Sequence, residues 1–324
     1  MSADRDALLA AVRANPDEDT PRLVLADWLD DHGEPDFAAF IRLEIERDRH
    51  EFMSPDWQTL DQRVRALRRG AFPGYVEGIL SPTRRGFHKH IQASVLALGN
   101  GIDRLGPYAP RLVVQLGAAT QQDQDAEREA AAGGPDRVGD ALHRIFASPW
   151  VREWVTLQTY SLRLTADRAA AMTRPGNLMG LVFLAIEGGA DDEAVRVFVD
   201  ADLPQLTHLA LVELAPVRDE PLLSAAALDT VLESALAPKL ELLRLWGNWF
   251  GDGLRQVVRS PRLENLRMLD ARHAPLDDDL LNLLASPAML PSLDRLVTDD
   301  LSEDQLVRLA GRIEAGLVVG PDED

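Results

Sequence analysis

The chain has 324 residues, with 34 basic and 53 acidic side chains, a formal net charge of −19 and no cysteine. Without cysteine, the chain forms no disulfide and has no thiolate chemistry. The negative charge argues against nucleic acid or an anionic membrane as a partner and allows a basic protein. No stretch of about 18 apolar residues and no basic signal-peptide region occurs, so we expect a soluble, cytoplasmic protein.

The first 50 residues are predicted to form a small all-helical module. Apolar residues recur at helical spacing over residues 4–14 and again after Thr20, a suitable N-cap that is followed by a proline. This second helix is expected to end at Gly33, a residue type that commonly follows a helix. A third helix is expected over residues 37–49.

Residues 8–33 read L-L-A-A-V-R-A-N-P-D-E-D-T-P-R-L-V-L-A-D-W-L-D-D-H-G. This string, above all its P-R-L-V-x-A-D-W-L core, resembles the repeat-companion domain, a helical module that precedes leucine-rich repeats in a family of bacterial proteins. The family continues with G-x-P-R-G-E-F-I-R-L, whereas residues 33–43 read G-E-P-D-F-A-A-F-I-R-L and lack the Arg-Gly-Glu. The resemblance implies an architecture and no particular reaction.

Residues 51–85 are expected to connect this module to the rest of the chain, mainly through a helix over residues 56–69. A strand in residues 86–94 and an apolar helix over residues 94–105 follow. In the family such a pair begins the solenoid, so we interpret it as the capping unit that covers the apolar face of the first repeat. The next strand is predicted over residues 110–116.

The solenoid is predicted to extend over residues 86–319. In its strand after Pro110, Val114 and Leu116 are expected to point inward. Residues 117–138 are polar and poor in large apolar side chains, so they are expected to be a mobile surface insertion. The acidic tail, residues 320–324, is expected to be disordered.

A repeat pattern organises the C-terminal half of the chain. Residues 240–250 read L-x-x-L-x-L-x-x-N-x-F, the signature of a leucine-rich repeat, in which Asn248 bonds backbone groups where the chain leaves a short strand. The L-x-x-L-x-L part recurs from positions 151, 178, 206, 240, 266 and 293. The spacing leaves room for one strand, one turn and one helix per unit, and most units end in a proline.

The predicted fold is therefore an α/β leucine-rich-repeat solenoid, similar to ribonuclease inhibitor, with a small all-helical module in front. Right-handed crossovers place parallel strands inside the arc and helices outside. Strand alternation then assigns the side chains between the leucines to the concave face. They are Glu153, Val155, Leu157, Gly180, Val182, Leu184, His208, Ala210, Val212, Leu242, Arg244, Trp246, Met268, Asp270, Arg272, Arg295, Val297 and Asp299.

Part of this face is predicted to bind a partner, because an aromatic side chain beside arginine is typical of an interface hot spot. The alternative for Trp246 is packing on the neighbouring turn, and we favour that interpretation for Trp249. A repeat frame that starts at Leu263 instead of Leu266 would shift one row by a strand position. The candidate partner-binding residues are Leu242, Arg244, Trp246, Met268, Asp270, Arg272, His208 and Arg295.

Two acidic clusters have the composition of a metal site. Asp27, Asp30, Asp31 and His32 lie within six residues, but a solvated helix end is the simpler interpretation. Residues 277–279 are three consecutive aspartates that lack the alternating spacing and the closing glutamate of a calcium loop. We expect the first of them to cap a helix and the others to favour its first turn.

A basic cluster precedes the solenoid. His88 and His90 would share one side of the predicted strand, but zinc needs three or four ligands. Together with Arg84, Arg85 and Lys89, the two histidines form a candidate anion- or peptide-binding patch. The alternative is a basic surface that faces the acidic N-terminal module.

The sequence contains no glycine-rich phosphate loop, no G-x-S-x-G and no H-E-x-x-H, so we assign no catalytic residue, metal or cofactor. We favour a non-enzymatic scaffold or adaptor that recognises another protein through the concave face. The alternative is an acidic inhibitor or regulator of a basic enzyme, because residues 277–324 carry 12 acidic and 3 basic side chains. A metal-dependent enzyme that uses either histidine-containing cluster is a third, less favoured possibility.

Overall fold

The computed structural model describes residues 3–77, 79–80, 83–109, 111–118, 120–212, 223–246, 253–274, 276–299 and 301–320. They form an α/β structure that divides into a first unit, residues 1–155, and a second unit, residues 156–324. Asn248 and Trp249, and the tail beyond Gly320, lie outside the described residues. In the described part of the chain, no helix has both the length and the apolar content needed to cross a bilayer.

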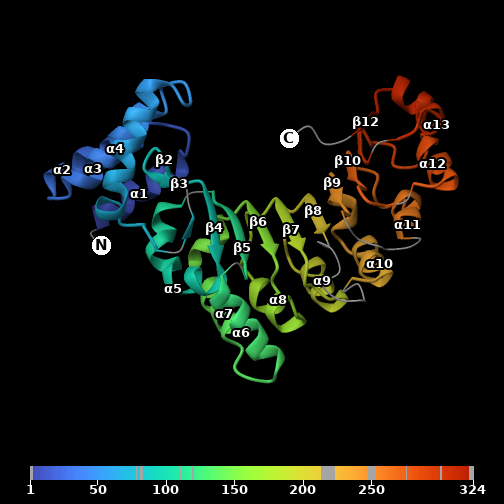
Figure 1. The fold of residues 1–324 in the computed structure, drawn as a ribbon, viewed down its shortest axis with the longest axis horizontal. Helices are drawn as coiled ribbons and strands as arrows, with labels where there is room; N and C mark the ends of the chain where they lie inside the picture. Colours follow the sequence, from blue (N-terminus) through green and yellow to red (C-terminus); the bar gives the residue numbers. More distant parts are fainter. Residues whose placement is uncertain are drawn as a thin grey trace. The chain divides into compact units, whose positions relative to one another are not determined.

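The first unit combines helices with a small sheet (Figure 1). Its helices are α1 (Ala3–Ala14), α2 (Thr20–Asp31), α3 (Pro35–Arg47), α4 (Pro55–Ala71), α5 (Val95–Leu105), α6 (Gln121–Ala131) and α7 (Arg137–Ala147), with short 3-10 turns η1 (Gly106–Tyr108) and η2 (Pro149–Glu153). Its strands are β1 (Ile79–Leu80), β2 (Thr83–Arg84), β3 (Phe87–His88), β4 (His90–Ser94) and β5 (Val113–Gly117).

The helices expected at the N-terminus are present, with small differences at their ends. Thr20 is the first residue of α2 rather than its N-cap, because Asp19 occupies the cap position and Pro21 follows in the first turn. Gly33 lies just after the helix with a φ of 82°, a left-handed conformation that glycine adopts without steric cost. Ser54 caps α4 by accepting a hydrogen bond from the backbone N–H of Trp57.

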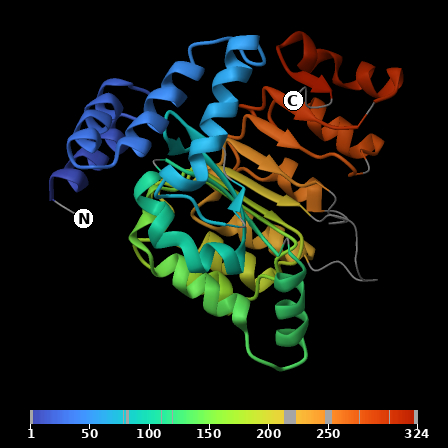
Figure 2. The same ribbon diagram turned by 60° about the vertical axis from the view of Figure 1, so that its left-hand side comes forward.

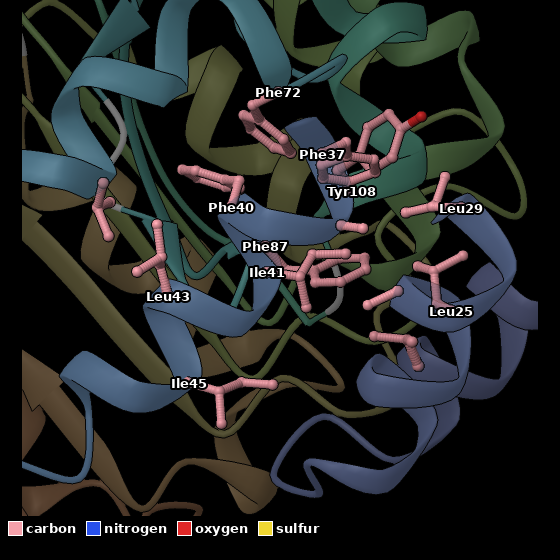
Figure 3. Close-up of a cluster of buried hydrophobic side chains, with 14 of the residues drawn as sticks. Leu25, Leu29, Phe37, Phe40, Ile41, Leu43, Ile45, Phe72, Phe87 and Tyr108 are labelled. Carbon is pink, nitrogen blue, oxygen red and sulfur yellow. The ribbon is translucent and has the colours of Figure 1, made fainter. Parts of the chain in front are cut away.

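One apolar core joins helices α1 to α4 with β3 and η1 (Figure 3). The ring of Phe72, which follows α4, lies 5.8 Å from Phe37, 5.4 Å from Phe40 and 5.4 Å from Tyr108, between centroids. Phe87 of β3 is also buried in this cluster. The N-terminal helices therefore depend on side chains contributed by residues well beyond position 50.

The single strand expected in residues 86–94 is divided between two strands. β3 pairs with β2 in an antiparallel hairpin, whereas β4 pairs in parallel with β5 and antiparallel with β1. Arg85 and Gly86 form the two-residue turn, and both have positive φ, 53° and 83°, as a type I′ turn requires. A side chain at Gly86 would collide with Ile41, because a Cβ there would lie 2.6 Å from its Cγ1.

Residues 117–138, expected to be a mobile surface insertion, contain the helix α6. Thr120 accepts a hydrogen bond from the backbone N–H of Asp123, whose carboxylate accepts one from the Thr120 N–H, so the helix starts with a complete capping box. The same carboxylate accepts the backbone N–H of Leu96 in α5. A short polar helix with few large apolar residues is held in place by this buried carboxylate.

The second unit alternates strands and helices (Figures 1 and 2). Its strands are parallel and pair in chain order. They are β6 (Thr156–Tyr160), β7 (Phe183–Glu187), β8 (His208–Val212), β9 (Leu242–Arg244), β10 (Met268–Asp270), β11 (Arg295–Val297) and β12 (Val318–Gly320). The helices are α8 (Ala166–Met172), α9 (Asp192–Val199), α10 (Ala225–Glu233), α11 (Gly253–Arg259), α12 (Asp278–Ala285) and α13 (Glu303–Glu314), with the short 3-10 turn η3 (Ala237–Lys239).

Helices α8 to α13 pack against one another in chain order along one side of the second unit's sheet, and we call the other side the open face. Leucines from successive strands form one buried row beneath the helices, as the repeat pattern predicts. These residues, each at most 1% exposed, are Leu157, Leu184, Leu209, Leu243, Leu269 and Leu296.

The repeat frame predicted for β6 and β7 is wrong by three residues. Phe183 pairs with His208 and Leu184 with Leu209, so Leu184 points into the core and not onto the open face. Leu157, aligned with Leu184, is buried in the same way. The side chains of these two strands that share the open face with His208 are Thr156, Gln158, Tyr160, Phe183, Ala185 and Glu187.

The four residues Glu153, Val155, Gly180 and Val182 of the predicted face precede β6 and β7 and are not strand residues. The frame predicted for the later strands agrees with the observed register. Met268 pairs with Leu242 and with Arg295, so the repeat that contains β10 starts at Leu266 and not at Leu263.

Candidate functional site

Side chains cross the open face of the second unit in rows that run from strand to strand. The first row is half-exposed and largely apolar, and its members are in register from strand to strand. It includes four of the predicted partner-binding residues. The first row consists of Thr156, Phe183, His208, Leu242, Met268, Arg295 and, at its exposed end, Val318.

The second row is more deeply buried than the first. Ala185 and Ala210 are each 1% exposed, and Asp270 and Val297 are fully buried although no helix of this unit covers them. The cover comes from larger neighbouring side chains, since Trp246 and Phe183 pack on the two alanines and on Val212. Small residues in one row thus allow bulky residues of the neighbouring rows to lie flat on the sheet.

Two side chains pack on the indole ring of Trp246. The guanidinium carbon of Arg272 lies 4.9 Å from the centre of its ring, and the imidazole of His273 stacks on it at 5.8 Å with an interplanar angle of 24°. His273 belongs to the turn after β10, so Trp246 packs on the neighbouring turn as the alternative interpretation states. The indole remains half-exposed, and its orientation is fixed by these contacts.

A buried carboxylate fixes the two arginines of the predicted site. Asp270 accepts a hydrogen bond from Arg244 Nε at 2.7 Å and two from Arg272, from Nε at 3.0 Å and from NH2 at 2.7 Å. The carboxylate is inaccessible to solvent, whereas the arginine side chains are 25% and 21% exposed. The cluster thus fixes both guanidinium groups at the open face and leaves them partly exposed.

Polar side chains border the first row. Thr207, Glu241 and Arg267 immediately precede β8, β9 and β10, and they line a shallow depression together with Lys239 and Asn265. An apolar row with a polar border has the composition of a protein–protein interface. The border was not identified from the sequence, although its members occupy the same position in successive repeats.

The predicted acidic cluster in the first unit is a paired helix end. Asp27 and Asp30 each form an ion pair with Arg42 at 2.7 Å. His32 stacks on Trp28 with ring centroids 3.8 Å apart. In the part of the chain that the structure describes, no group of three or more histidine, aspartate or glutamate side chains is arranged to hold a metal ion.

The predicted basic patch lies against acidic side chains in the segments that connect the N-terminal helices. His88 does not belong to this surface, because it is 2% exposed and its Nε2 lies 3.1 Å from the carbonyl oxygen of Gly74, whereas His90 on β4 is half-exposed. The basic surface thus faces the acidic module, which the alternative interpretation describes. The pairs are Arg84–Asp48 at 2.6 Å, Arg85–Asp19 at 3.5 Å and Lys89–Asp17 at 3.7 Å.

A buried carboxylate in the first unit was missed by the sequence analysis. Glu44 of α3 accepts hydrogen bonds from Thr83 Oγ1 and from the backbone N–H of Gly86, both at 2.5 Å, and Arg47 lies 3.5 Å away. Burial raises the pKa of the Glu44 carboxyl. The contacts hold the β2–β3 hairpin on α3, so the role of this residue is structural. Its position among apolar residues, in F-I-R-L-E-I, is the signal that was available.

Asp277 is the N-cap of α12, as predicted. Its carboxylate accepts the backbone N–H of Leu280 at 2.9 Å. That hydrogen bond, with a further contribution from Arg255, holds the pKa of the Asp277 carboxyl below its ordinary value.

A comparison of the chain with protein-family models finds no match, and a comparison with curated proteins finds none either.

Proposed function

We propose that the chain is a leucine-rich-repeat solenoid, led by a module that resembles the repeat-companion domain, and that it recognises another protein without catalysing a reaction. The binding surface is the open face of the second unit. The observation that carries this proposal is the first row, in which Phe183, Leu242 and Met268 are half-exposed in register across neighbouring strands.

Two properties of the open face support recognition of a protein. The apolar first row is bordered by polar residues, the arrangement typical of an interface with a dry centre and a wet border. The contacts of Trp246 and Asp270 fix the surface before a partner arrives, which lowers the entropic cost of binding.

The proposal is tested with a double variant, Leu242→Ser/Met268→Ser. Both side chains are half-exposed, so their truncation removes apolar contact area while the Asp270 cluster stays intact. A matched control, Met179→Ser/Val182→Ser, removes two side chains that are 37% and 38% exposed outside the first row. Proteins retained from a lysate of the source organism are compared quantitatively among wild type and the two variants, after equal thermal unfolding temperatures have been established.

We expect a partner that is retained by wild type and control and that loses at least about tenfold in affinity for the first-row variant. Equal retention of every bound protein by all three forms would contradict recognition by the open face. The purified pair also decides between the two binding classes, because an inhibitor that binds a basic enzyme through its acidic groups predicts an affinity that falls steeply with salt.

A further inference from the structure

The last repeat of the second unit has an unpaired sheet edge. β12 stands at the end of the strand order and pairs with β11 alone within the described residues. Val318 N–H donates to Asp294 and Thr298 N–H donates to Gly320, so residues 318 and 320 direct their backbone groups towards β11. By strand alternation, the N–H and C=O of Val319 point to the free edge.

The same repeat carries an exposed apolar surface. Val307 and Ile313 on α13 are 73% and 38% exposed, and Val318 on β12 is 60% exposed. The terminal repeats of solenoids normally have a polar outer face, because they have no neighbour to cover an apolar one. Apolar groups beside an open strand edge are a typical place for another strand to add.

The C-terminal residues, 301–324, are predominantly acidic. Residues 301–324 contain six acidic and two basic side chains. Both basic side chains are engaged, since Arg308 pairs with Asp278 at 2.9 Å and Arg312 is buried against backbone carbonyl groups. α13 therefore exposes three carboxylates, those of Glu303, Asp304 and Glu314, and one arginine, Arg308, which is paired.

We propose that the free edge of β12 and the outer side of α13 bind an extended basic segment of a partner protein, which adds as one further strand. Main-chain hydrogen bonds would form with Val319, and apolar side chains on one face of the segment would pack on Val318. Lysine or arginine residues between them would meet the carboxylates of this end. A second copy of this chain is disfavoured as occupant, because two acidic ends repel each other.

The test uses the full chain and a synthetic nine-residue peptide of alternating lysine and valine, acetylated and amidated at its ends. Hydrogen–deuterium exchange at physiological salt is expected to show peptide-dependent protection in residues 316–320. Val319→Pro removes the N–H at the free edge, and Val318→Ser removes exposed apolar surface without a change in charge. Each is expected to weaken binding at least tenfold, whereas Val182→Ser, 38% exposed and remote from β12 in the strand order, is expected to leave it unchanged.

Three results would overturn the proposal. The first is a failure of the β12 contacts, seen as no protection of residues 316–320 at millimolar peptide or as the same affinity for Val318→Ser as for wild type. The second is equal protection by a peptide with glutamate in place of lysine, which would remove the requirement for a basic segment. The third is a wild-type dimer in sedimentation velocity that becomes a monomer in Val319→Pro, because a second copy would then occupy the edge. The Leu242→Ser/Met268→Ser variant is expected to bind the peptide normally, so this test is independent of Leu242 and Met268, on which the test of the proposed function depends.

Discussion

Acid should weaken the first unit through one buried histidine. His88 lies in the aromatic core, with its ring 4.9 Å from that of Phe72 and its Nε2 3.1 Å from the carbonyl oxygen of Gly74. Burial lowers the pKa of His88 to about 4, the contact with Gly74 opposes this change, and the positive charge of Arg68 contributes to it. The ordinary value, which applies in the unfolded chain, is about 6.5.

The sign of the effect follows from proton binding. Because the folded pKa lies below the unfolded one, the unfolded chain takes up a proton first as the pH falls from 7. The stability contributed by neutral His88 is therefore present above pH 6.5 and is lost as the pH falls towards 4. The gap between the two pKa values corresponds to about 3 kcal/mol of unfolding free energy.

The substitution His88→Gln removes the titration and keeps an N–H donor for Gly74. Unfolding free energies of wild type and variant are measured in urea between pH 7.5 and pH 4, with amide exchange in residues 83–94 as the local probe. We expect the advantage of wild type over the variant to shrink by about 3 kcal/mol across this range. The raised pKa of Glu44 stabilises the fold as the pH falls, but it acts in both proteins and cancels in the difference.

A pH-independent difference between the two proteins would refute the reasoning. It would mean that His88 has the same pKa in the folded and unfolded chain. Burial of its ring would then not be maintained in solution.

Three further substitutions test particular contacts. Arg312→Lys should lower the unfolding free energy of the second unit in urea by about 2 kcal/mol, because lysine has fewer and differently directed donors for the carbonyl groups; Arg308→Lys, at the surface, should change it little. Asp270→Asn should cost about 3 kcal/mol in the same assay, since two arginines lose their buried counter-charge, and an unchanged midpoint would contradict the ion cluster. Thr120→Ala should destabilise α6 by about 1 kcal/mol, seen as faster amide exchange confined to residues 121–131.

Helix positions were predictable because the local signals agree with the packing. In α2, the string P-R-L-V-L-A-D-W-L places Pro21 in the first turn and buries Leu25 and Leu29. Arg22 is also buried, and its guanidinium donates to the carbonyl oxygens of Pro16 and Glu18 in the loop before the helix. Apolar periodicity predicts the burial of Leu25 and Leu29, whereas the burial of Arg22 depends on the loop that it binds.

The repeat frame failed where the sequence offers two equivalent choices. Leu178, Leu181 and Leu184 are spaced three apart, so an L-x-x-L pattern can start at either of the first two. Pairing with β8 selects the later start. In the unit at β9, only a start at Leu240 fits the full L-x-x-L-x-L pattern, and there the predicted open face is correct.

The burial of His88 could not be predicted from the sequence, because it depends on an unusual turn just before this residue. A type I′ hairpin normally has asparagine, aspartate or glycine at its first central position, whereas Arg85 occupies it here. Ion pairs of Arg85 with Asp19 and Asp48, both at 3.5 Å, hold the arginine in this left-handed conformation. Those partners are 66 and 37 residues away in the sequence, so local patterns could not indicate the hairpin.

The buried arginine of α13 has a consequence for the way this end of the chain unfolds. Arg312 binds carbonyl oxygens of residues 284, 286, 289, 290 and 293, which lie at the end of α12 and in the connection from α12 to β11. Detaching α13 would leave the Arg312 guanidinium and these carbonyl oxygens without hydrogen-bond partners in a poorly hydrated space. The outermost helix of a row of packed helices tends to open early, but α13 is hydrogen-bonded to the segment before it and should open together with that segment. The final two repeats would then behave as a single cooperative block in hydrogen exchange.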